Sequence, residues 1–121
     1  MSIKFSNNAS AALASGINNA VTALTVATGA GALFPTLSAG DYFYATLVDS
    51  SNNIEVIKVT ARTGDNFTIV RGQDGTTARS YASGDKVECR LTAGGLSAIQ
   101  GEATAAATTA TNDALAFAIA L

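Results

Sequence analysis

The sequence predicts a mainly β fold, a small antiparallel β-barrel or sandwich followed by a C-terminal alanine-rich α-helix. Four runs rich in β-branched and aromatic residues follow one another between residues 41 and 91. Clusters of Gly, Asp, Asn and Ser separate these runs, as in antiparallel meanders. The composition then changes to alanine and threonine, which predicts a β-rich domain at 1–93 and an arm at 94–121.

Two short strands are predicted within the first forty residues, which are otherwise small and polar. Residues 3–5 have an extended pattern, and residues 24–26 alternate apolar and polar side chains. A glycine-rich turn at 28–31 interrupts this pattern. Leu33 and Phe34 precede the sole proline, and we expect this apolar pair to pin the loop to the core.

The predicted meander begins with a hairpin between residues 41–48 and 54–60, joined by a loop rich in Asp, Ser and Asn. A second turn at 63–66 leads into a strand at 67–71. Both faces of strand 54–60 have apolar character, which predicts a sheet covered on both sides. One face carries Glu55, Ile57 and Val59, and the other carries Ile54, Val56, Lys58 and Thr60.

The last predicted strand, residues 86–91, alternates charged with apolar side chains. We expect its charged side chains to face outward and Val87, Cys89 and Leu91 to face inward. Cys89 is the only cysteine, which excludes an intrachain disulfide and a cysteine-based metal cluster. Its place in the alternation predicts a small buried hydrophobe.

The arm has a narrow apolar stripe at helical spacing. Alanine favours a helix here, whereas Gly101 and the threonines oppose it, so an isolated helix would be marginal. Spacings of three and four place these residues on one stripe, with small side chains in the middle: Leu96, Ile99, Ala103, Ala107, Ala110, Ala114, Phe117 and Leu121. The stripe predicts an oligomerisation or docking helix. A helix folded back on its own β domain and a disordered tail are the alternatives.

The charge content is low for a soluble domain, and it limits the class of partner. Charged residues make up 13% of the chain, against about 25% in typical domains, so we expect partners to cover part of the surface. The seven basic residues are scattered, which excludes a nucleic-acid stripe. Without a long apolar segment, we expect no membrane partner and no secretion signal, and synthesis in the cytoplasm.

The residue inventory argues against an enzyme. With no histidine, imidazole-based triads and histidine metal sites are excluded. The aspartates of the predicted turns are expected to bind nearby backbone amides rather than to form a catalytic pair. These are Asp41, Asp49, Asp65, Asp74 and Asp85. We therefore predict no catalytic residue, no cofactor and no metal site.

Between the strands at 67–71 and 86–91 lies a loop of unusual composition. It begins with Arg71, Gly72, Gln73, Asp74, Gly75 and Thr76. Its glycines permit positive backbone dihedrals, and its polar side chains can bind the loop's own amides. We expect a rigid structural loop, in which Arg71 and the later Arg79 pair with Asp74.

At these residues the sequence resembles a domain of virion structural proteins from tailed bacteriophages, particularly the N-terminal, particle-proximal part of tail fibres. Three stretches carry the resemblance, namely residues 3–9, residues 40–43, and residues 71–78 together with 84–85. The resemblance spans about residues 1–93.

The resemblance implies a virion-attachment domain that joins a fibre or decoration to the particle, often as a homotrimer, without enzymatic activity or cofactor. The implied partners are further copies of the chain and other virion proteins of the tail, neck or capsid. The implied location is the virion. Such fibres usually continue into a long shaft and a receptor-binding tip, so host recognition is not expected of these 121 residues.

Three hypotheses follow. The first is a virion component that anchors or forms a short fibre by trimerising through residues 96–121. The second is a capsid decoration protein that cements neighbouring capsomers. The third, from another class, is a glycan-binding module in which Tyr42, Tyr44 or Tyr81 stacks on sugar rings, although the absence of tryptophan weakens it.

Overall fold

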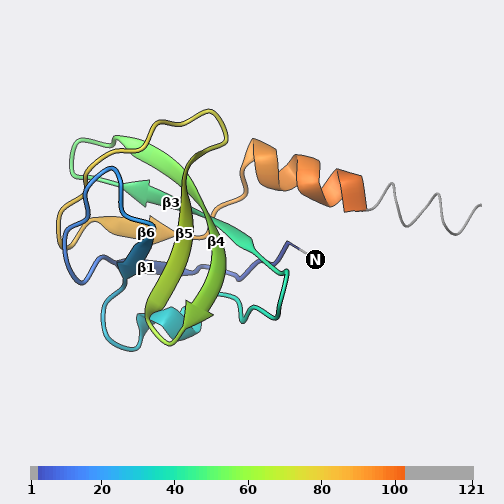
Figure 1. Ribbon diagram of the computed structural model, residues 1–121, viewed down its shortest axis with the longest axis horizontal. Coiled ribbons are helices and arrows are strands. Elements are labelled where there is room, and N and C mark those ends of the chain that lie inside the picture. Colours follow the sequence, from blue (N-terminus) through green and yellow to red (C-terminus); the bar gives the residue numbers. More distant parts are fainter. Residues whose placement is uncertain (1–2, 103–121) are drawn as a thin grey trace, which may run out of the picture.

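A computed structural model describes residues 3–102, which form a curled antiparallel sheet and a C-terminal helix (Figure 1). The predicted mainly β fold with a C-terminal helix is confirmed, and the sheet forms a half-barrel. Its strands are β1 (Ser10–Ala12), β2 (Ala23–Thr25), β3 (Phe43–Val48), β4 (Ile54–Thr63), β5 (Asn66–Gln73) and β6 (Lys86–Glu88). A 3-10 helix, η1 (Ala30–Leu33), follows β2, and the C-terminal helix covers residues 93–102.

The six strands form one sheet in the order β1-β6-β3-β4-β5-β2. Each neighbouring pair is antiparallel, as the meander predicted. The register of β4 against β5 shifts twice, and such irregularities bend and twist a strand pair. The curl brings the two edge strands together at an antiparallel bridge between Leu13 and Val26. Backbone hydrogen bonds of 2.9 Å, from Ala14 N to Thr25 O and from Ala27 N to Ala12 O, flank this bridge.

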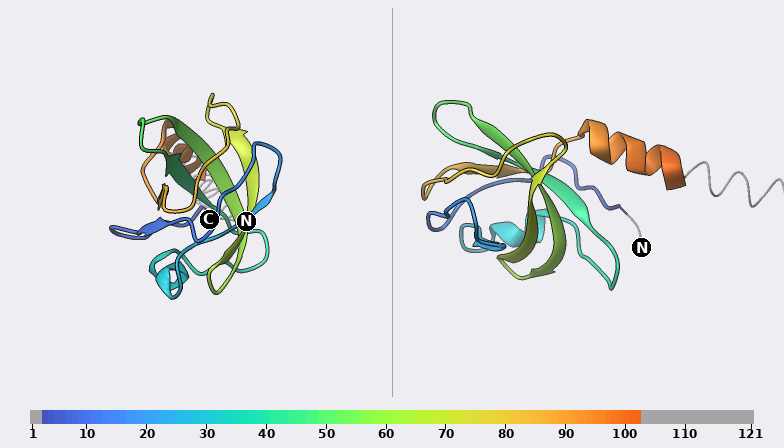
Figure 2. Two further views of the ribbon diagram at one scale, coloured as in Figure 1. Left: turned by 90° about the vertical axis from the view of Figure 1, so that its left-hand side faces the viewer. Right: turned by 45° about the horizontal axis from the view of Figure 1, so that its top comes forward.

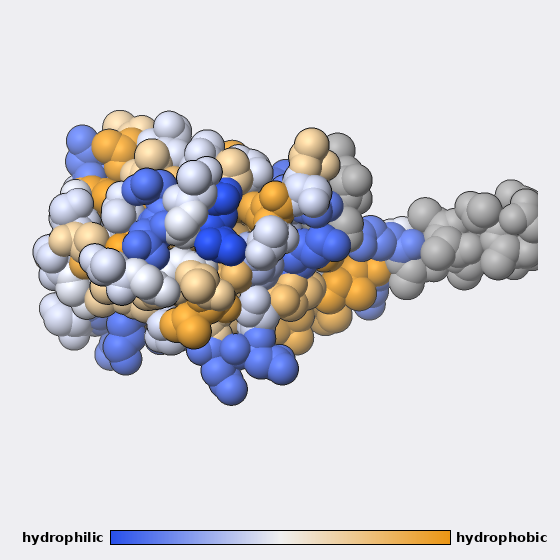
Figure 3. Space-filling view, turned by 90° about the horizontal axis from the view of Figure 1, so that it is seen from below, coloured by the Kyte–Doolittle hydropathy of each residue, from blue (hydrophilic) through white to orange (hydrophobic). Residues whose placement is uncertain are grey.

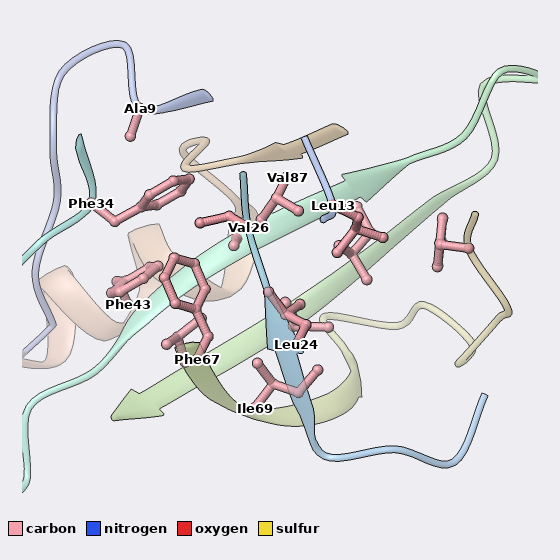
Figure 4. Packing of buried hydrophobic residues seen from close by; sticks show 14 residues of the cluster. Ala9, Leu13, Leu24, Val26, Phe34, Phe43, Phe67, Ile69 and Val87 are labelled. Carbon is pink, nitrogen blue, oxygen red and sulfur yellow. The ribbon is translucent and has the colours of Figure 1, made fainter. Parts of the chain in front are cut away.

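The hollow of the sheet is filled by apolar side chains from nearly every strand (Figure 4). Three phenylalanines form the aromatic part of this core. Phe34 and Phe67 meet edge to face at 5.0 Å between ring centroids, and Phe43 lies 5.8 Å from each of them. Leu13, Leu24, Val26, Ile69 and Val87 fill the neighbouring space.

Phe34 pins the η1 segment as expected, but the prediction that Leu33 does the same is wrong. Phe34 is buried, whereas Leu33 is 53% exposed. Consecutive residues at the end of a tight helical turn point in different directions, so only one of the two enters the core. The turn itself is fixed by Asp65, whose carboxylate accepts hydrogen bonds from Gly29 N and Gly31 N.

The prediction for residues 86–91 is correct for Val87 and wrong for Leu91. Val87 is fully buried, but β6 ends at Glu88, and Leu91 is 66% exposed. Alternation between the faces requires a continuing strand, and the chain leaves the sheet before Leu91. Cys89 is half-buried and packs against the core, and burial raises the pKa of its thiol.

The N-terminal segment and the C-terminal helix lie at the same end of the molecule (Figures 1 and 2). Ile3 forms a parallel bridge with Tyr42, and Lys4 N donates to Tyr42 O at 2.8 Å. The extended segment predicted at residues 3–5 therefore joins the sheet through a single bridge. No helix within residues 3–102 is long and apolar enough to cross a membrane.

Candidate functional site

The first turn of the C-terminal helix is capped from two parts of the chain. Thr92 is the local cap, since its hydroxyl oxygen accepts from Gly95 N at 2.9 Å and its carbonyl accepts from Leu96 N at 2.8 Å. Asp74 supplies a second cap from twenty residues away, because its Oδ1 accepts from Gly94 N at 3.0 Å. A carboxylate is also favourable at this end of the helix dipole.

Gly95 allows this helix to lie directly on the β body. A Cβ added at Gly95 would stand 3.6 Å from both Ile3 Cδ1 and Tyr44 Cδ2, and 3.1 Å from Thr92 Oγ1. The space above Ile3 and Tyr44 is therefore filled by the helix backbone. One further contact joins the last described turn to the body, from Ile3 N to Glu102 Oε1 at 3.1 Å.

The predicted apolar stripe starts with two side chains that the β body leaves partly exposed. Leu96 is 46% exposed and Ile99 is 36% exposed, whereas Gly95 is buried. At about 100° per residue, Leu96 lies about 100° and Ile99 about 40° from the Gly95 direction. The space-filling view shows hydrophobic residues gathered at the end of the body from which the helix leaves (Figure 3). The remaining predicted stripe residues lie outside the described residues: Ala103, Ala107, Ala110, Ala114, Phe117 and Leu121.

A buried ion pair holds the loop that carries Asp74. The guanidinium of Arg71 donates two hydrogen bonds to the Glu55 carboxylate, at 2.8 and 2.9 Å. Gly72 N and Arg79 N each donate to the same carboxylate at 2.9 Å. The side chains of Arg71 and Glu55 are 9% and 0% exposed. Burial alone would raise the pKa of Glu55, but the hydrogen bonds from Arg71, Gly72 and Arg79 outweigh it and lower that pKa.

Arg71 uses its remaining donors to join distant parts of the backbone. Its Nη1 donates to Asn18 O at 2.6 Å and to Val21 O at 3.1 Å, and its Nη2 donates to Arg79 O. The expectation that Arg71 pairs with Asp74 is therefore wrong. The inward face of β4 brings Glu55 to Arg71, while Asp74 lies at the tip of the loop and points to the helix.

We name residues 71–79 the motif loop. Three of its residues have positive φ, 58° at Gly72, 55° at Asp74 and 76° at Gly75. Thr76 N donates to Gln73 O at 3.0 Å and closes the turn. The Thr76 hydroxyl accepts from Val56 N at 2.9 Å, which ties the loop back to β4.

Tyr81 cannot serve as a sugar-stacking platform, contrary to the glycan hypothesis. It is 4% exposed and belongs to the core, because the Ile17–Tyr81 bridge draws its backbone against the body. Burial raises the pKa of its phenol to about 12. The hydroxyl has no hydrogen-bond partner among the described residues.

Tyr42 and Tyr44 are adjacent, but contacts within the protein engage them. Their rings meet edge to face at 5.7 Å, and Lys58 Nζ lies 4.5 Å from the Tyr42 ring centroid. Burial raises the pKa of Tyr42. Tyr44 also lies beneath the first turn of the C-terminal helix, since a Cβ added at Gly95 would stand 3.6 Å from its ring.

The turn aspartates bind backbone amides, as predicted. Asp41 accepts from Ser38 N, Asp49 from Ser51 N and Asn53 N, Asp65 from Gly29 N and Gly31 N, Asp74 from Gly94 N, and Asp85 from Ala82 N. Hydrogen bonds, first those from Asn53, lower the pKa of Asp49. Three of these amides belong to two distant segments, the η1 turn and the C-terminal helix, so the expectation of nearby amides is wrong for Asp65 and Asp74.

A pocket of about 280 Å³ lies between two loops and is lined by Val48, Asp49, Ser50, Asn52, Gly84, Asp85 and Lys86. Its two carboxylates are both engaged by backbone amides of their own loops. Residues 3–102 contain no cluster of three metal-ligating side chains. The residues that line this pocket include neither a nucleophile paired with a base nor a group of metal ligands.

Comparison of the sequence with models of known protein families and with curated proteins finds no match. Within the described chain, the most distinctive arrangement is a helix held by Asp74, Gly95 and Glu102 that leaves the apolar side chains of Leu96 and Ile99 partly exposed.

Proposed function

We propose that this protein is a structural component of a tailed-bacteriophage particle. It attaches or forms a short fibre through a trimeric β domain and C-terminal helix. Its partners are further copies of itself and other proteins of the tail, neck or capsid. The role requires no catalytic residue and no cofactor.

The observation that carries the proposal is the exposure of Leu96 and Ile99 on a helix that is already anchored to the β body through its first and last described turns. Fully burying a side chain of this size contributes about 1.5 to 3 kcal/mol. Both side chains keep a third or more of their surface in water, so a helix–helix contact has apolar surface left to bury. Small residues predicted further along the stripe would let neighbouring helices approach closely.

The resemblance to phage virion domains supports the choice of assembly. Its best-marked stretch, residues 71–78, is the part of the chain that builds the Glu55 ion pair and the Asp74 cap. In this protein those residues serve the architecture rather than a ligand site. A particle component needs a rigid body and a surface for its neighbours. The buried Glu55–Arg71 pair is consistent with a rigid body, and the exposed Leu96 and Ile99 are consistent with such a surface.

Light scattering of the purified full chain tests self-association. We expect a mass three times that of the 12.1 kDa chain, and a shift toward monomer when Leu96→Glu and Ile99→Glu are combined. Leu33→Glu is the matched control, because Leu33 is also exposed and apolar but lies on η1. A wild-type chain that stays monomeric at every concentration, or a double variant that assembles like the control, would reject the helix as the contact.

Reconstruction of purified particles tests the location. Density for this chain at a tail, neck or fibre base supports the proposal. Density between capsomers of the shell would replace it with the decoration hypothesis. Particles that lack the chain altogether would remove the virion assignment.

A further inference from the structure

The motif loop lies between the core and the C-terminal helix, and hydrogen bonds connect it to both. Its two ends are fixed by the Glu55 carboxylate, which accepts from Gly72 N and Arg79 N. Its middle is fixed by the Thr76 hydroxyl on Val56 N. A loop held at three points has little freedom to move relative to the sheet. The tip of the loop is therefore held close to the sheet on both sides.

Asp74 is the group at that tip, and its carboxylate reaches the helix rather than the loop's own amides. The bond from Gly94 N to Asp74 Oδ1 spans twenty residues of sequence. Asp74 also has a φ of 55°, a conformation that few residues other than glycine, asparagine and aspartate adopt readily. Asp74 thus combines the backbone shape of the turn with an acceptor for the helix.

We propose that the motif loop is an orientation clamp, which fixes the direction in which the C-terminal helix leaves the β body, with Asp74 as the positioning residue. The clamp acts at the first turn of the helix, and the Gly95 contact is the pivot next to it. The contact from Ile3 N to Glu102 Oε1 limits movement of the last described turn.

The direction of the helix decides how copies of the chain could meet. A helix that is free to swing about Gly95 would turn Leu96 and Ile99 toward or away from a neighbour, whereas a clamped helix presents them at one angle. This consequence for assembly rests on the proposed function. The clamp itself belongs to a single chain and can be tested whether or not the chain self-associates.

Two substitutions at Asp74 separate the carboxylate from the backbone conformation. Asp74→Gly keeps the positive φ but removes the acceptor, and Asp74→Asn keeps both the φ preference and a side-chain oxygen. Loss of a hydrogen bond to a charged group should speed amide exchange at Gly94 by about tenfold or more in Asp74→Gly. Asp74→Asn should retain most of the protection.

Nuclear magnetic resonance measures both readouts, through amide exchange at Gly94 and through residual dipolar couplings of helix and body. In Asp74→Gly we expect the couplings of residues 93–102 to stop fitting the alignment of the β body, while Asp74→Asn fits as the wild type does. Asp85→Gly is the matched control, since Asp85 also accepts a backbone amide in a loop but one distant from the helix.

Unchanged Gly94 exchange together with unchanged helix couplings in Asp74→Gly would overturn the clamp. So would an Asp74→Asn protein that behaves like Asp74→Gly while its β body keeps its wild-type couplings. Light scattering of the same samples reports assembly separately. A monomeric wild type would therefore contradict the proposed function and leave the result for the clamp intact.

Discussion

The buried pair between Glu55 and Arg71 makes a quantitative prediction about stability. In Glu55→Gln, an amide NH2 group replaces one carboxylate oxygen. This group donates hydrogen bonds, so it faces the N–H groups of Arg71, Gly72 or Arg79 without an acceptor between them. The guanidinium, only 9% exposed, then loses its counter-charge in the interior. Breaking a buried ion pair by removing one partner costs about 3 to 5 kcal/mol. Since domains of this size are stable by about 5 to 15 kcal/mol, we expect Glu55→Gln to lose a large part of its stability.

Urea denaturation followed by circular dichroism measures this loss as a lower midpoint at an unchanged slope. The double variant Glu55→Leu/Arg71→Leu separates the cost of an unpaired charge from the value of the pair. It removes both charges but also takes the partners from the amides of Gly72 and Arg79 and from the carbonyls that Arg71 binds. We therefore expect it to be destabilised too, by unpaired backbone groups rather than by an unpaired charge. A loss below about 1 kcal/mol in Glu55→Gln, in the range of a surface ion pair, would refute the buried network.

Four further predictions concern single groups. Gly31→Ala would place a Cβ 2.1 Å from Gly64 O, and this backbone clash should cost about 1 to 3 kcal/mol in thermal or urea unfolding. Gly101→Ala, whose Cβ meets nothing within 4 Å, should instead stabilise the protein by up to about 1 kcal/mol through helix propensity. Tyr81→Phe removes a buried hydroxyl without a partner among the described residues, so stability should stay equal or rise by about 1 kcal/mol. The lowered pKa of Glu55 means that the unfolded state binds protons more readily. Stability from this group is therefore full above the unfolded pKa and is lost as the pH falls through the folded one.

Each of these has a clear contrary result. Gly31→Ala that unfolds like the wild type would mean that η1 does not pack against the turn at Gly64. A Gly101→Ala protein with lower stability would contradict open space beside that residue. A loss above about 1 kcal/mol in Tyr81→Phe would require a partner for the hydroxyl. In an acid titration, Glu55→Gln should show a smaller dependence on pH than the wild type, and an identical dependence would contradict the assignment to Glu55.

The sequence predicted the meander because each of its strands has strong local signals. β3, β4 and β5 are rich in β-branched and aromatic residues and are bounded by turn residues. β1 was not predicted, since Ser10–Ala12 has no β-branched or aromatic residue and exists through its pairing with β6. Local β-propensity does not predict a strand of three residues that is formed by pairing with a strand more than seventy residues away.

The candidate site was predicted in part. Spacing identified Leu96 and Ile99, because helical periodicity is visible in sequence. The roles of Asp74 and Gly95 were missed, since they depend on the tertiary approach of the motif loop and of Ile3 to the first turn. The Glu55–Arg71 pair depends on the β4–β5 register, which includes a bulge. The sequence held one signal of this pair, because Glu55 shares a strand face with Ile57 and Val59. Glutamate is almost never fully buried without a partner, so a glutamate on an apolar face indicates a buried partner.

The bridge at Leu13 and Val26 has a consequence for how copies of this chain could associate. Edge strands with unpaired amides invite another chain to add a strand, and a net charge of -2 offers little repulsion against such stacking. Here the amides of Ala14 and Ala27 are already bonded across the seam. At this seam the main chain is already paired within the molecule, so another chain could add a strand there only by breaking these two hydrogen bonds.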